Sequence, residues 1–270
     1  MFRVPTNHEN PPQNIIIFEE FFGKYIESVQ PKLSREYLPV YWTNYYISRN
    51  YGQQDMSDLQ RYLDSLDRSK KYFTVIQWDD GILNKIKDLD LFIFASGGIG
   101  DYPIPLSSYY CDNDISVTPI EKRRFFASFV GAIWGRHFVR EEMARKLKPP
   151  FAITDVRYDY KSYLKIMRDS VFSLCPRGYG KTSFRIYESL MCKSVPIYIY
   201  DDPWIPYFDK NFEKYGVLCD IKNIDMLEEK LKNMTVDQIN EKLENGNKVF
   251  KEKYSYGSIC KKIIGIVNEN

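Results

Sequence analysis

Short apolar runs alternate with helical patterns along most of this chain, and this alternation restricts the possible folds more than any other feature. Strands that alternate with helices pair in parallel, because each helix returns the chain to the starting edge of the sheet. The pattern therefore predicts an α/β fold with mostly parallel sheets. The expected strands are 14–18, 38–42, 72–77, 91–95, 125–130, 171–174, 195–200 and 217–219, and the expected helices are 19–29, 55–66, 139–146, 183–191, 225–234, 236–253 and 257–267.

A proline- and polar-rich stretch, 101–119, interrupts the alternation and indicates a domain boundary. At 270 residues the chain is long enough for two domains of ordinary size. We expect a first Rossmann-like domain over 1–118 and a second over 119–270, which ends in closing helices. Two such sheets facing each other create a central cleft at the carboxyl ends of their strands, where ligands bind in open α/β folds.

Charge and cysteine usage exclude several classes of protein. The net charge is +2 and no polybasic block is present, so we expect no nucleic acid partner. The first residues lack the apolar core of a signal peptide, and no run of about 18 apolar residues occurs, which predicts a soluble, cytoplasmic chain without a transmembrane segment. Five cysteines without a CxxC pair indicate reduced thiols.

The densest group of signals lies in residues 171–207, which read as strand, glycine-rich loop, helix and strand. Gly178 and Gly180 permit positive φ angles in the loop, and the following helix offers free N–H groups and a partial positive charge. Arg177 and Lys181 add positive charge. The combination favours binding of a phosphate group.

The helix after this loop carries a further pair of charged residues. Ser183 is a suitable N-cap, which places Arg185 in the first turn, where the helix dipole disfavours a cation unless an anion is nearby. Glu188 lies three residues on and shares a face with Arg185, so it could accept hydrogen bonds from two ribose hydroxyls. The alternative interpretation is a surface ion pair between the two side chains.

A P-loop is a competing interpretation, because Gly180-Lys181-Thr182 ends like GxxxxGK[ST] and Asp201 follows an apolar strand. That motif requires glycine at position 175, which is Cys175, and Pro176 stiffens the loop where the phosphate cradle must bend. The sequence disfavours the P-loop.

The same run resembles the donor-binding signature of the exostosin-like glycosyltransferases, as in a short, soluble member. It departs from the signature at Lys193-Ser194, where the family commonly has Gly-Cys or a similar small pair. Weaker similarity extends upstream to 41–44, 77–81, 97–100 and 129–131. The matching positions are Cys175-Pro176, Gly178, Ser183, Arg185, Glu188, Ser194 and Val195-Pro196.

The resemblance implies a GT-B fold, a nucleotide-diphosphate sugar donor, which we expect to be a UDP-sugar, and inversion at the anomeric carbon. In that arrangement the second domain binds the donor, and Arg177, Lys181 and Arg185 neutralise the departing diphosphate. Gly131 would let backbone approach the phosphates, with His137 and Arg140 beside them. The donor-binding residues expected in full are Gly131, His137, Arg140, Pro176, Arg177, Gly178, Tyr179, Lys181, Ser183, Arg185 and Glu188.

An inverting transfer also needs a base on the acceptor side of the cleft. Asp79 and Asp80 follow the expected strand 72–77, where catalytic groups gather, and Asp101 is the second candidate. The alternative for Asp79-Asp80-Gly81 is an ordinary β-turn.

Asp112-Asn113-Asp114 resembles a DxD metal clamp, but no clear apolar strand precedes it, so we expect a metal-independent enzyme without a cofactor. The leading hypothesis is an inverting hexosyl- or pentosyltransferase that moves a sugar to a hydroxyl of a glycan or glycoprotein acceptor. The alternatives are a P-loop-like phosphotransferase and a non-catalytic glycan-binding module.

Overall fold

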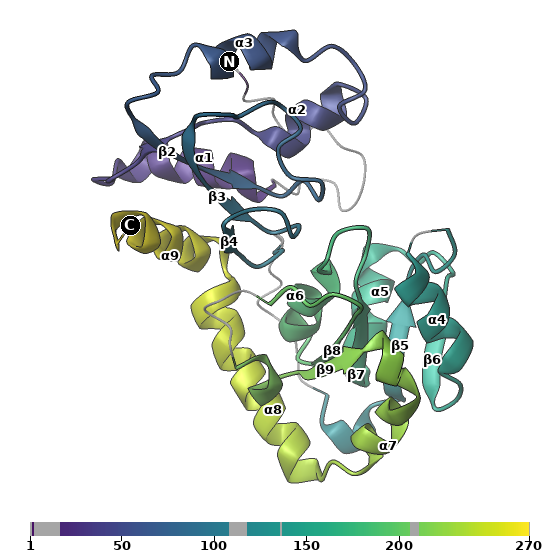
Figure 1. The fold of residues 1–270 in the computed structure, drawn as a ribbon. Helices are drawn as coiled ribbons and strands as arrows, with labels where there is room; N and C mark the ends of the chain where they lie inside the picture. The colour runs from purple at the N-terminus through teal and green to yellow at the C-terminus, as the bar shows by residue number, and fades with distance from the viewer. Residues whose placement is uncertain (1, 3–16, 108–117, 136, 206–210, 270) are drawn as a thin grey trace. The chain divides into compact units, whose positions relative to one another are not determined.

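The computed structural model describes residues 2, 17–107, 118–135, 137–205 and 211–269 (Figure 1). The chain divides into two compact units: residues 1–109 together with 255–270, and residues 110–254. Each unit contains one parallel sheet with helices packed on it. The α/β prediction is confirmed, and two parallel-sheet units are the components of a GT-B protein.

The first unit is built on four parallel strands in the order β1-β2-β3-β4. Residues 77–89, which connect β2 to β3, form turns and no helix, so this unit lacks one crossover helix of a Rossmann-like domain. Its strands are β1 (Glu36–Tyr37), β2 (Lys71–Ile76), β3 (Asp90–Ala95) and β4 (Tyr102–Pro103), and its helices are α1 (Phe18–Val29), α2 (Trp42–Ser48), α3 (Ser57–Asp64) and α9 (Tyr256–Glu269).

The last helix, α9, belongs to the first unit. It presents Ile259, Cys260 and Ile263 on one face, at the spacing of an amphipathic helix, and these side chains are buried with Phe22 of α1 and Phe73 of β2. The expected second domain, 119–270, therefore differs from the structure, which assigns residues 255–270 to the first unit. Helical periodicity shows which face is apolar but not which sheet covers it.

The second unit is a five-stranded parallel sheet in the order β6-β5-β7-β8-β9. Adjacent residues of its strands face opposite sides of the sheet. Leu174 and Ile197 are buried in an apolar cluster with side chains of α4 and α7, whereas Cys175 and Tyr198 are buried in a second cluster with side chains of α5 and α6. The strands are β5 (Phe125–Val130), β6 (Phe151–Thr154), β7 (Ser170–Pro176), β8 (Val195–Tyr200) and β9 (Val217–Asp220), and the helices are α4 (Phe138–Lys146), α5 (Tyr160–Arg168), α6 (Phe184–Met191), α7 (Leu227–Lys232) and α8 (Val236–Val249).

Most expected elements are present within a residue or two, although α8 ends four residues before the expected helix 236–253, and one expected strand is absent. Residues 38–41 form no strand, and α2 begins at Trp42, because the aromatic run there fills the core from a helix. The sequence analysis missed β6 and α5, which together supply one edge strand and one helix of the second unit. Of the expected strand 14–18, residues 14–16 lie outside the described residues, and Phe18 opens α1.

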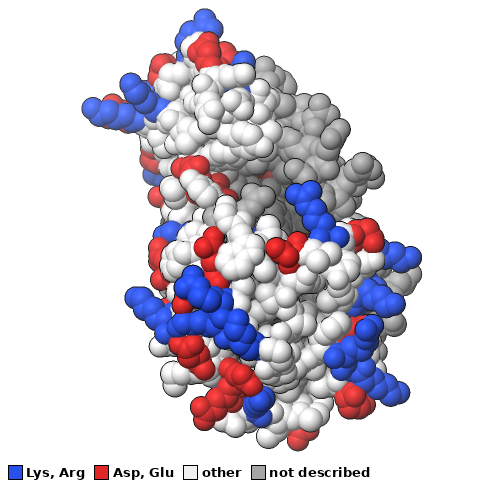
Figure 2. All heavy atoms as spheres, turned by 90° about the vertical axis from the view of Figure 1, so that its right-hand side faces the viewer, with Lys and Arg blue, Asp and Glu red and all other residues white. Residues whose placement is uncertain are grey.

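Charged side chains of both signs lie next to one another on the face shown in Figure 2. Some ion pairs of the chain lie within a single helix, such as Lys232 with Glu228 on α7 at 2.6 Å. None of the described helices has the length and apolar character needed to cross a bilayer.

Candidate functional site

The candidate site lies at the point in the second sheet where the strand order reverses. The chain runs from β5 outward to β6 and then returns to the other side of β5 with β7, so the loops after β5 and β7 diverge from neighbouring strands. Ligands of open parallel sheets bind at such a switch point, beyond the carboxyl ends of the strands. The two loops are residues 131–137 and 177–183, which hold most of the expected donor-binding residues.

The loop after β7 leads into the N-terminus of α6, as expected. The Ser183 hydroxyl accepts the Arg185 backbone N–H at 3.3 Å, so Ser183 is the N-cap. Within the loop the Gly178 N–H donates to the Thr182 carbonyl at 3.2 Å. The helix dipole and the remaining N–H groups of its first turn are directed toward the loop.

Cys175 and Pro176 lie in β7 rather than in the loop, paired with Tyr198 and Ile199 of β8. Burial raises the pKa of the Cys175 thiol to about 12. A phosphate cradle of the P-loop type needs a glycine loop to begin at position 175, and a buried strand residue occupies that place. The structure therefore disfavours the P-loop alternative on geometry as well as on residue type.

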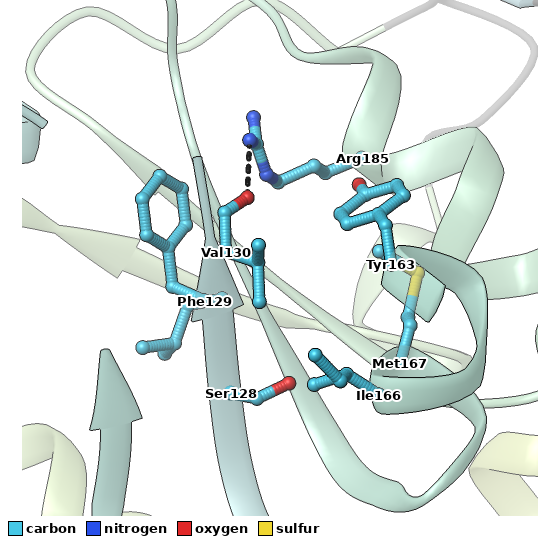
Figure 3. A pocket seen from close by; sticks show the side chains of 8 residues that line it. Ser128, Phe129, Val130, Tyr163, Ile166, Met167 and Arg185 are labelled. Atoms are coloured by element: carbon cyan, nitrogen blue, oxygen red, sulfur yellow. Dashed lines mark hydrogen bonds between the residues drawn. The ribbon is translucent and has the colours of Figure 1, made fainter. Parts of the chain in front are cut away.

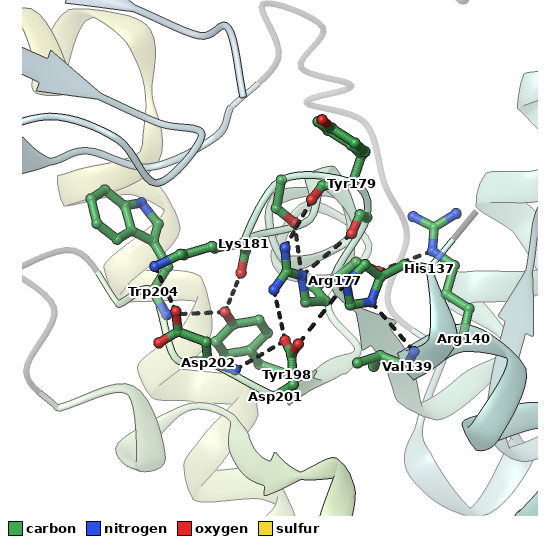
Figure 4. Close-up of polar contacts among 12 residues, drawn as sticks. His137, Val139, Arg140, Arg177, Tyr179, Lys181, Tyr198, Asp201, Asp202 and Trp204 are labelled. Atoms are coloured by element: carbon green, nitrogen blue, oxygen red, sulfur yellow. Dashed lines mark hydrogen bonds and ion pairs between the residues drawn. The ribbon is translucent and has the colours of Figure 1, made fainter. Parts of the chain in front are cut away.

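Arg177 is turned into its own loop and holds it closed (Figure 4). Its Nη1 pairs with Asp201 Oδ1 at 2.7 Å, its Nη2 donates to the Tyr179 carbonyl at 2.8 Å, and its Nε donates to the Gly180 carbonyl at 3.2 Å. The residue is only 9% exposed. The phosphate contact expected of Arg177 stays a prediction, and the structure adds a role in shaping the loop.

His137 joins the loop after β5 to the end of β8. Its Nδ1 accepts the Val139 N–H at 3.4 Å and caps α4, and its Nε2 lies 3.9 Å from Asp201 Oδ2. Burial, followed by the charge of Arg177, lowers the pKa of His137. The neutral ring then carries its proton on Nε2, because Nδ1 is the acceptor. This N–H can be offered to an anion.

Asp201, at the end of β8, is the shared partner in this network. Burial opposes its ionisation, but the hydrogen bond and charge of Arg177 outweigh burial and keep the pKa of Asp201 below its ordinary value. The Asp201 carboxylate compensates the positive charge of Arg177 and does not compensate the charges of the other cations of the site.

Arg140, from α4, connects the two loops. Its Nε donates to the Arg177 carbonyl at 3.1 Å and its Nη1 donates to the Ala132 carbonyl at 3.0 Å. A Cβ at Gly178 would lie 3.3 Å from Arg140 Nη2, so the glycine permits the close approach of this side chain. Arg140 therefore fixes the distance between the loops on either side of the switch point.

Lys181 and Tyr179 lie at the surface of the site. Lys181 Nζ pairs with Asp202 Oδ2 at 2.6 Å, and both side chains are partly exposed. An exposed pair of this kind contributes about 0–1 kcal/mol, so an incoming phosphate can replace Asp202 at little cost. Tyr179 is 67% exposed. Below them, the Tyr198 hydroxyl donates to the Lys181 carbonyl and accepts the Trp204 N–H at 3.1 Å.

The close approach of Arg185 to the end of β5 requires a glycine at position 131. Figure 3 shows the Arg185 guanidinium beside the Val130 carbonyl. The Arg185 Nη2 donates to the Val130 carbonyl at 2.7 Å, and its guanidinium carbon lies 4.4 Å from the centroid of the Phe129 ring. Gly131 has a φ of 147°, and a Cβ there would lie 2.0 Å from Arg185 Nη2. The expected approach of a phosphate to Gly131 stays a prediction, whereas the approach of Arg185 is present.

Glu188 faces Tyr163 of α5, whose hydroxyl donates to Glu188 Oε2 at 2.5 Å. Burial raises the pKa of Glu188, while the hydrogen bond from Tyr163 and the charge of Arg185 act in the opposite direction. Arg185 and Glu188, both described, form no ion pair within 4.0 Å, so the alternative of a surface ion pair is wrong. Sequence reasoning missed Tyr163 because it missed α5.

In the first unit, the turn that was the alternative interpretation of Asp79-Asp80-Gly81 is present, with the Gly81 N–H donating to the Trp78 carbonyl at 3.1 Å. Asp79 is partly exposed and Asp80 is exposed beyond the carboxyl end of β2. A Cβ at Gly97 would lie 2.7 Å from Asp79 Cα, so the loop after β3 adjoins this turn.

Asp101 lies directly before β4 and contacts β3. Its Oδ2 accepts the Ile93 N–H at 2.8 Å, in the body of β3, and β4 begins at the next residue. The structure thus places Asp101 beside Ile93 of β3, where its carboxylate accepts a backbone N–H. The roles of the three aspartates as bases stay predictions.

Glu19 is a buried carboxyl group that sequence reasoning did not single out. It accepts the Gln77 N–H at 2.6 Å, the Thr43 N–H at 2.9 Å and the Thr43 hydroxyl at 2.7 Å. Burial raises its pKa to about 7, although the three hydrogen bonds oppose the shift. The position in the first turn of α1 is typical of an acidic residue, so its sequence context carried no separate signal.

The described residues contain no group of three or more His, Cys, Asp or Glu side chains arranged to hold a metal ion. Asp112-Asn113-Asp114 lies outside the described residues.

Comparison with known families shows which family the chain belongs to. The family description of the exostosin GT47 domain matches residues 97–234, just over half of the chain. This chain belongs to the exostosin GT47 glycosyltransferase family. The match contains both loops of the switch point and the whole of the donor-binding signature, which confirms the resemblance found in the sequence.

Individual relatives are more distant. The chain is 32% identical over 87 residues to a probable glucuronosyltransferase of Oryza sativa subsp. japonica and 30% identical over 82 residues to probable glucuronosyltransferase 47 A of Physcomitrium patens. These alignments cover 32% and 30% of this chain, and 21% and 18% of the relatives. The match thus spans about a fifth of the length of these curated relatives.

Among solved structures, TarM is similar with a TM-score of 0.45 and 9% identity, over 93% of this chain and 58% of TarM. A glycosyltransferase from Rickettsia africae ESF-5 has a TM-score of 0.41 and 13% identity, over 98% and 83% of the two chains.

The departure of this GT47 chain from the signature at Lys193 has a visible consequence. Lys193 follows α6 with a φ of 54°, the left-handed conformation that glycine adopts most easily. The Ser194 N–H still donates to the Ser189 carbonyl at 2.9 Å, so the helix ends as it would with glycine. The departure from the signature is thus accommodated by the backbone at the end of α6.

Proposed function

We propose that this protein is an inverting glycosyltransferase that moves a hexosyl or pentosyl group from a UDP-sugar to a hydroxyl of a glycan or glycoprotein. The second unit binds the donor, and the first unit binds the acceptor and supplies the base. The observation that carries the proposal is the constellation at the switch point: a capped helix N-terminus, a lysine in an exposed ion pair and the Nε2 of His137, all beyond the carboxyl ends of β5, β7 and β8.

In this proposal the donor diphosphate lies at the N-terminus of α6. Lys181 exchanges Asp202 for a phosphate oxygen, and His137 donates its Nε2–H to another. Arg185 contributes its positive charge from below the loop. Arg177 and Arg140 shape the two loops through contacts with carbonyl groups and Asp201. Their charges also favour the anion at longer range.

Glu188 supports recognition of the ribose. One of its carboxylate oxygens accepts the Tyr163 hydroxyl, which fixes the orientation of the group. A carboxylate held in this way, one turn below the N-terminus of α6, can accept hydrogen bonds from ribose hydroxyls while the diphosphate contacts the helix end.

The chemical step forms one bond and breaks one bond at the anomeric carbon. The acceptor oxygen attacks this carbon from the face opposite the diphosphate, the bond to the phosphate oxygen breaks, and its electron pair leaves with UDP. The proton of the acceptor hydroxyl passes to a carboxylate, for which we propose Asp79 or Asp80. The positive groups of the second unit stabilise the charge that develops on the diphosphate, and we propose that no metal ion is needed.

Lys181→Gln tests the donor site without disturbing the core. We expect it to weaken UDP binding about tenfold in calorimetric titration in the presence of EDTA, because it removes one charge-assisted contact to phosphate. Lys232→Gln is the matched control, since Lys232 forms an exposed ion pair of the same 2.6 Å length on α7. Equal UDP affinity in the two variants would contradict the proposed site, and loss of UDP binding by the unaltered chain in EDTA would contradict metal independence.

A further inference from the structure

Two aromatic side chains, Tyr51 and Trp78, are accessible at the carboxyl end of β2, and the buried ring of Tyr46 lies beneath Trp78. The Trp78 ring lies between Tyr46 and Tyr51, with ring centroids 5.6 Å and 6.1 Å away. Tyr46 is fully buried, Trp78 is partly exposed, and Tyr51 is 62% exposed. We call Tyr51 and Trp78 the aromatic surface.

The base of this surface is rigid. The Tyr46 hydroxyl accepts the Leu83 N–H at 3.0 Å and donates to Asn84 Oδ1 at 3.3 Å. The Tyr46 carbonyl accepts the Gly52 N–H at 3.0 Å, which ties the turn that carries Tyr51 to the end of α2. The aromatic surface is therefore held in place before any ligand arrives.

Tyr51 occupies this position at a cost. Its φ is 58°, between Asn50 at 49° and Gly52 at 77°, so a bulky residue adopts the left-handed conformation in the middle of the turn. Such strain persists at sites where the side chain has a function, since glycine would form the same turn more easily. An exposed aromatic ring on a strained backbone gains the fold little and is available to a ligand.

The polar groups around the aromatic surface indicate the chemistry of that ligand. Asp79 and Asp80 follow Trp78 directly and reach solvent. A sugar ring offers an apolar face of C–H groups to an aromatic ring and hydroxyls that can donate to carboxylates. A phosphate or another anion would be repelled by the two aspartates.

We propose that the aromatic surface of Tyr51 and Trp78 binds a sugar ring of the acceptor glycan, with the hydroxyls of that ring directed to Asp79 and Asp80. This inference rests on the proposed function, because it assigns the acceptor subsite of the same enzyme. It names Tyr51 as a residue that sets acceptor affinity and takes no part in donor binding.

The test uses Tyr51→Gly in the full chain, with binding measured on a printed array of neutral and acidic oligosaccharides. We expect the affinity of the chain for the oligosaccharides that it binds to fall roughly fivefold to tenfold, because an aromatic stacking contact is lost. We also expect the melting temperature to rise by about 2–4 °C, because glycine relieves the strain. Tyr51→Phe should retain binding, and Tyr158→Ala, which removes a tyrosine that is 47% exposed in the second unit, is the control.

Hydrolysis of UDP-sugar in the absence of acceptor separates this inference from the proposed function. If Tyr51→Gly hydrolyses the donor at the unaltered rate but binds fewer oligosaccharides, the aromatic surface is the acceptor subsite. Unchanged oligosaccharide binding in Tyr51→Gly, or no binding by the unaltered chain while donor hydrolysis proceeds, would overturn the inference alone. Failure of the unaltered chain to bind UDP or hydrolyse any donor would instead overturn the proposed function.

Discussion

Gly131→Ala should destabilise the second unit by displacing Arg185. The new Cβ would lie 2.0 Å from Arg185 Nη2, so the guanidinium must move away from the Val130 carbonyl and the Phe129 ring. The lost hydrogen bond from a charged donor contributes about 1.5–3 kcal/mol, and the lost cation–π contact contributes about 0.5–1 kcal/mol. Alanine at a φ of 147° adds about 1–3 kcal/mol of backbone strain.

The expected loss of unfolding free energy is therefore about 3–7 kcal/mol, measured by urea unfolding followed with far-UV circular dichroism. Gly135→Ala is the matched control: Gly135 also has a positive φ, 65°, but a Cβ there meets no atom within 4 Å. We expect that control to lose only the backbone part, about 1 kcal/mol.

A double-mutant cycle with Arg185→Ala isolates the steric contribution. In the Arg185→Ala background the guanidinium is absent, so Gly131→Ala should cost only its backbone strain, which leaves a coupling energy of about 2–4 kcal/mol. If Gly131→Ala costs the same with and without Arg185, the clash is not the reason for glycine at this position. The reasoning from the geometry of Arg185 would then be refuted.

Two further predictions concern carboxyl groups with raised pKa values. In the folded state the pKa of Glu19 is about 7, above its ordinary value of 4.5. Between these pH values Glu19 is protonated in the folded chain and ionised in the unfolded chain. The free energy of unfolding should therefore fall by about 3 kcal/mol as the pH rises from 4.5 to 7. Glu19→Gln should remove this contribution to the decrease of the urea unfolding midpoint between pH 5 and pH 7.5. If the midpoint depends on pH equally in the variant and the unaltered chain, Glu19 does not titrate in this range. Tyr163→Phe removes a hydrogen bond that lowers the pKa of Glu188, so the acidic limb of the pH profile of UDP binding should move to higher pH. A profile that does not move would argue against ribose recognition by the Glu188 carboxylate.

The sequence by itself determined the elements whose signals are local. The strands at 72–77 and 195–200 and the helix that Ser183 caps are readable because propensity, periodicity and capping act within one turn or one strand. The donor-binding signature was readable for the same reason, since its glycines and charges occur within a single strand, loop and helix. Membership of the GT47 family rests on the match over residues 97–234, which contains that local pattern.

Only the tertiary structure decided which way each charged side chain turns. Arg177 and Arg185 occur in the same signature, yet one closes its loop onto Asp201 and the other crosses to the strand that ends at Val130. Their partners are 24 and 55 residues away, at distances set by strand order rather than by spacing in the chain. The buried carboxyl of Glu19 and the attachment of α9 to the first unit depend on such distant partners as well. Local patterns specify elements, whereas burial and hydrogen-bond partners arise only when distant segments pack together.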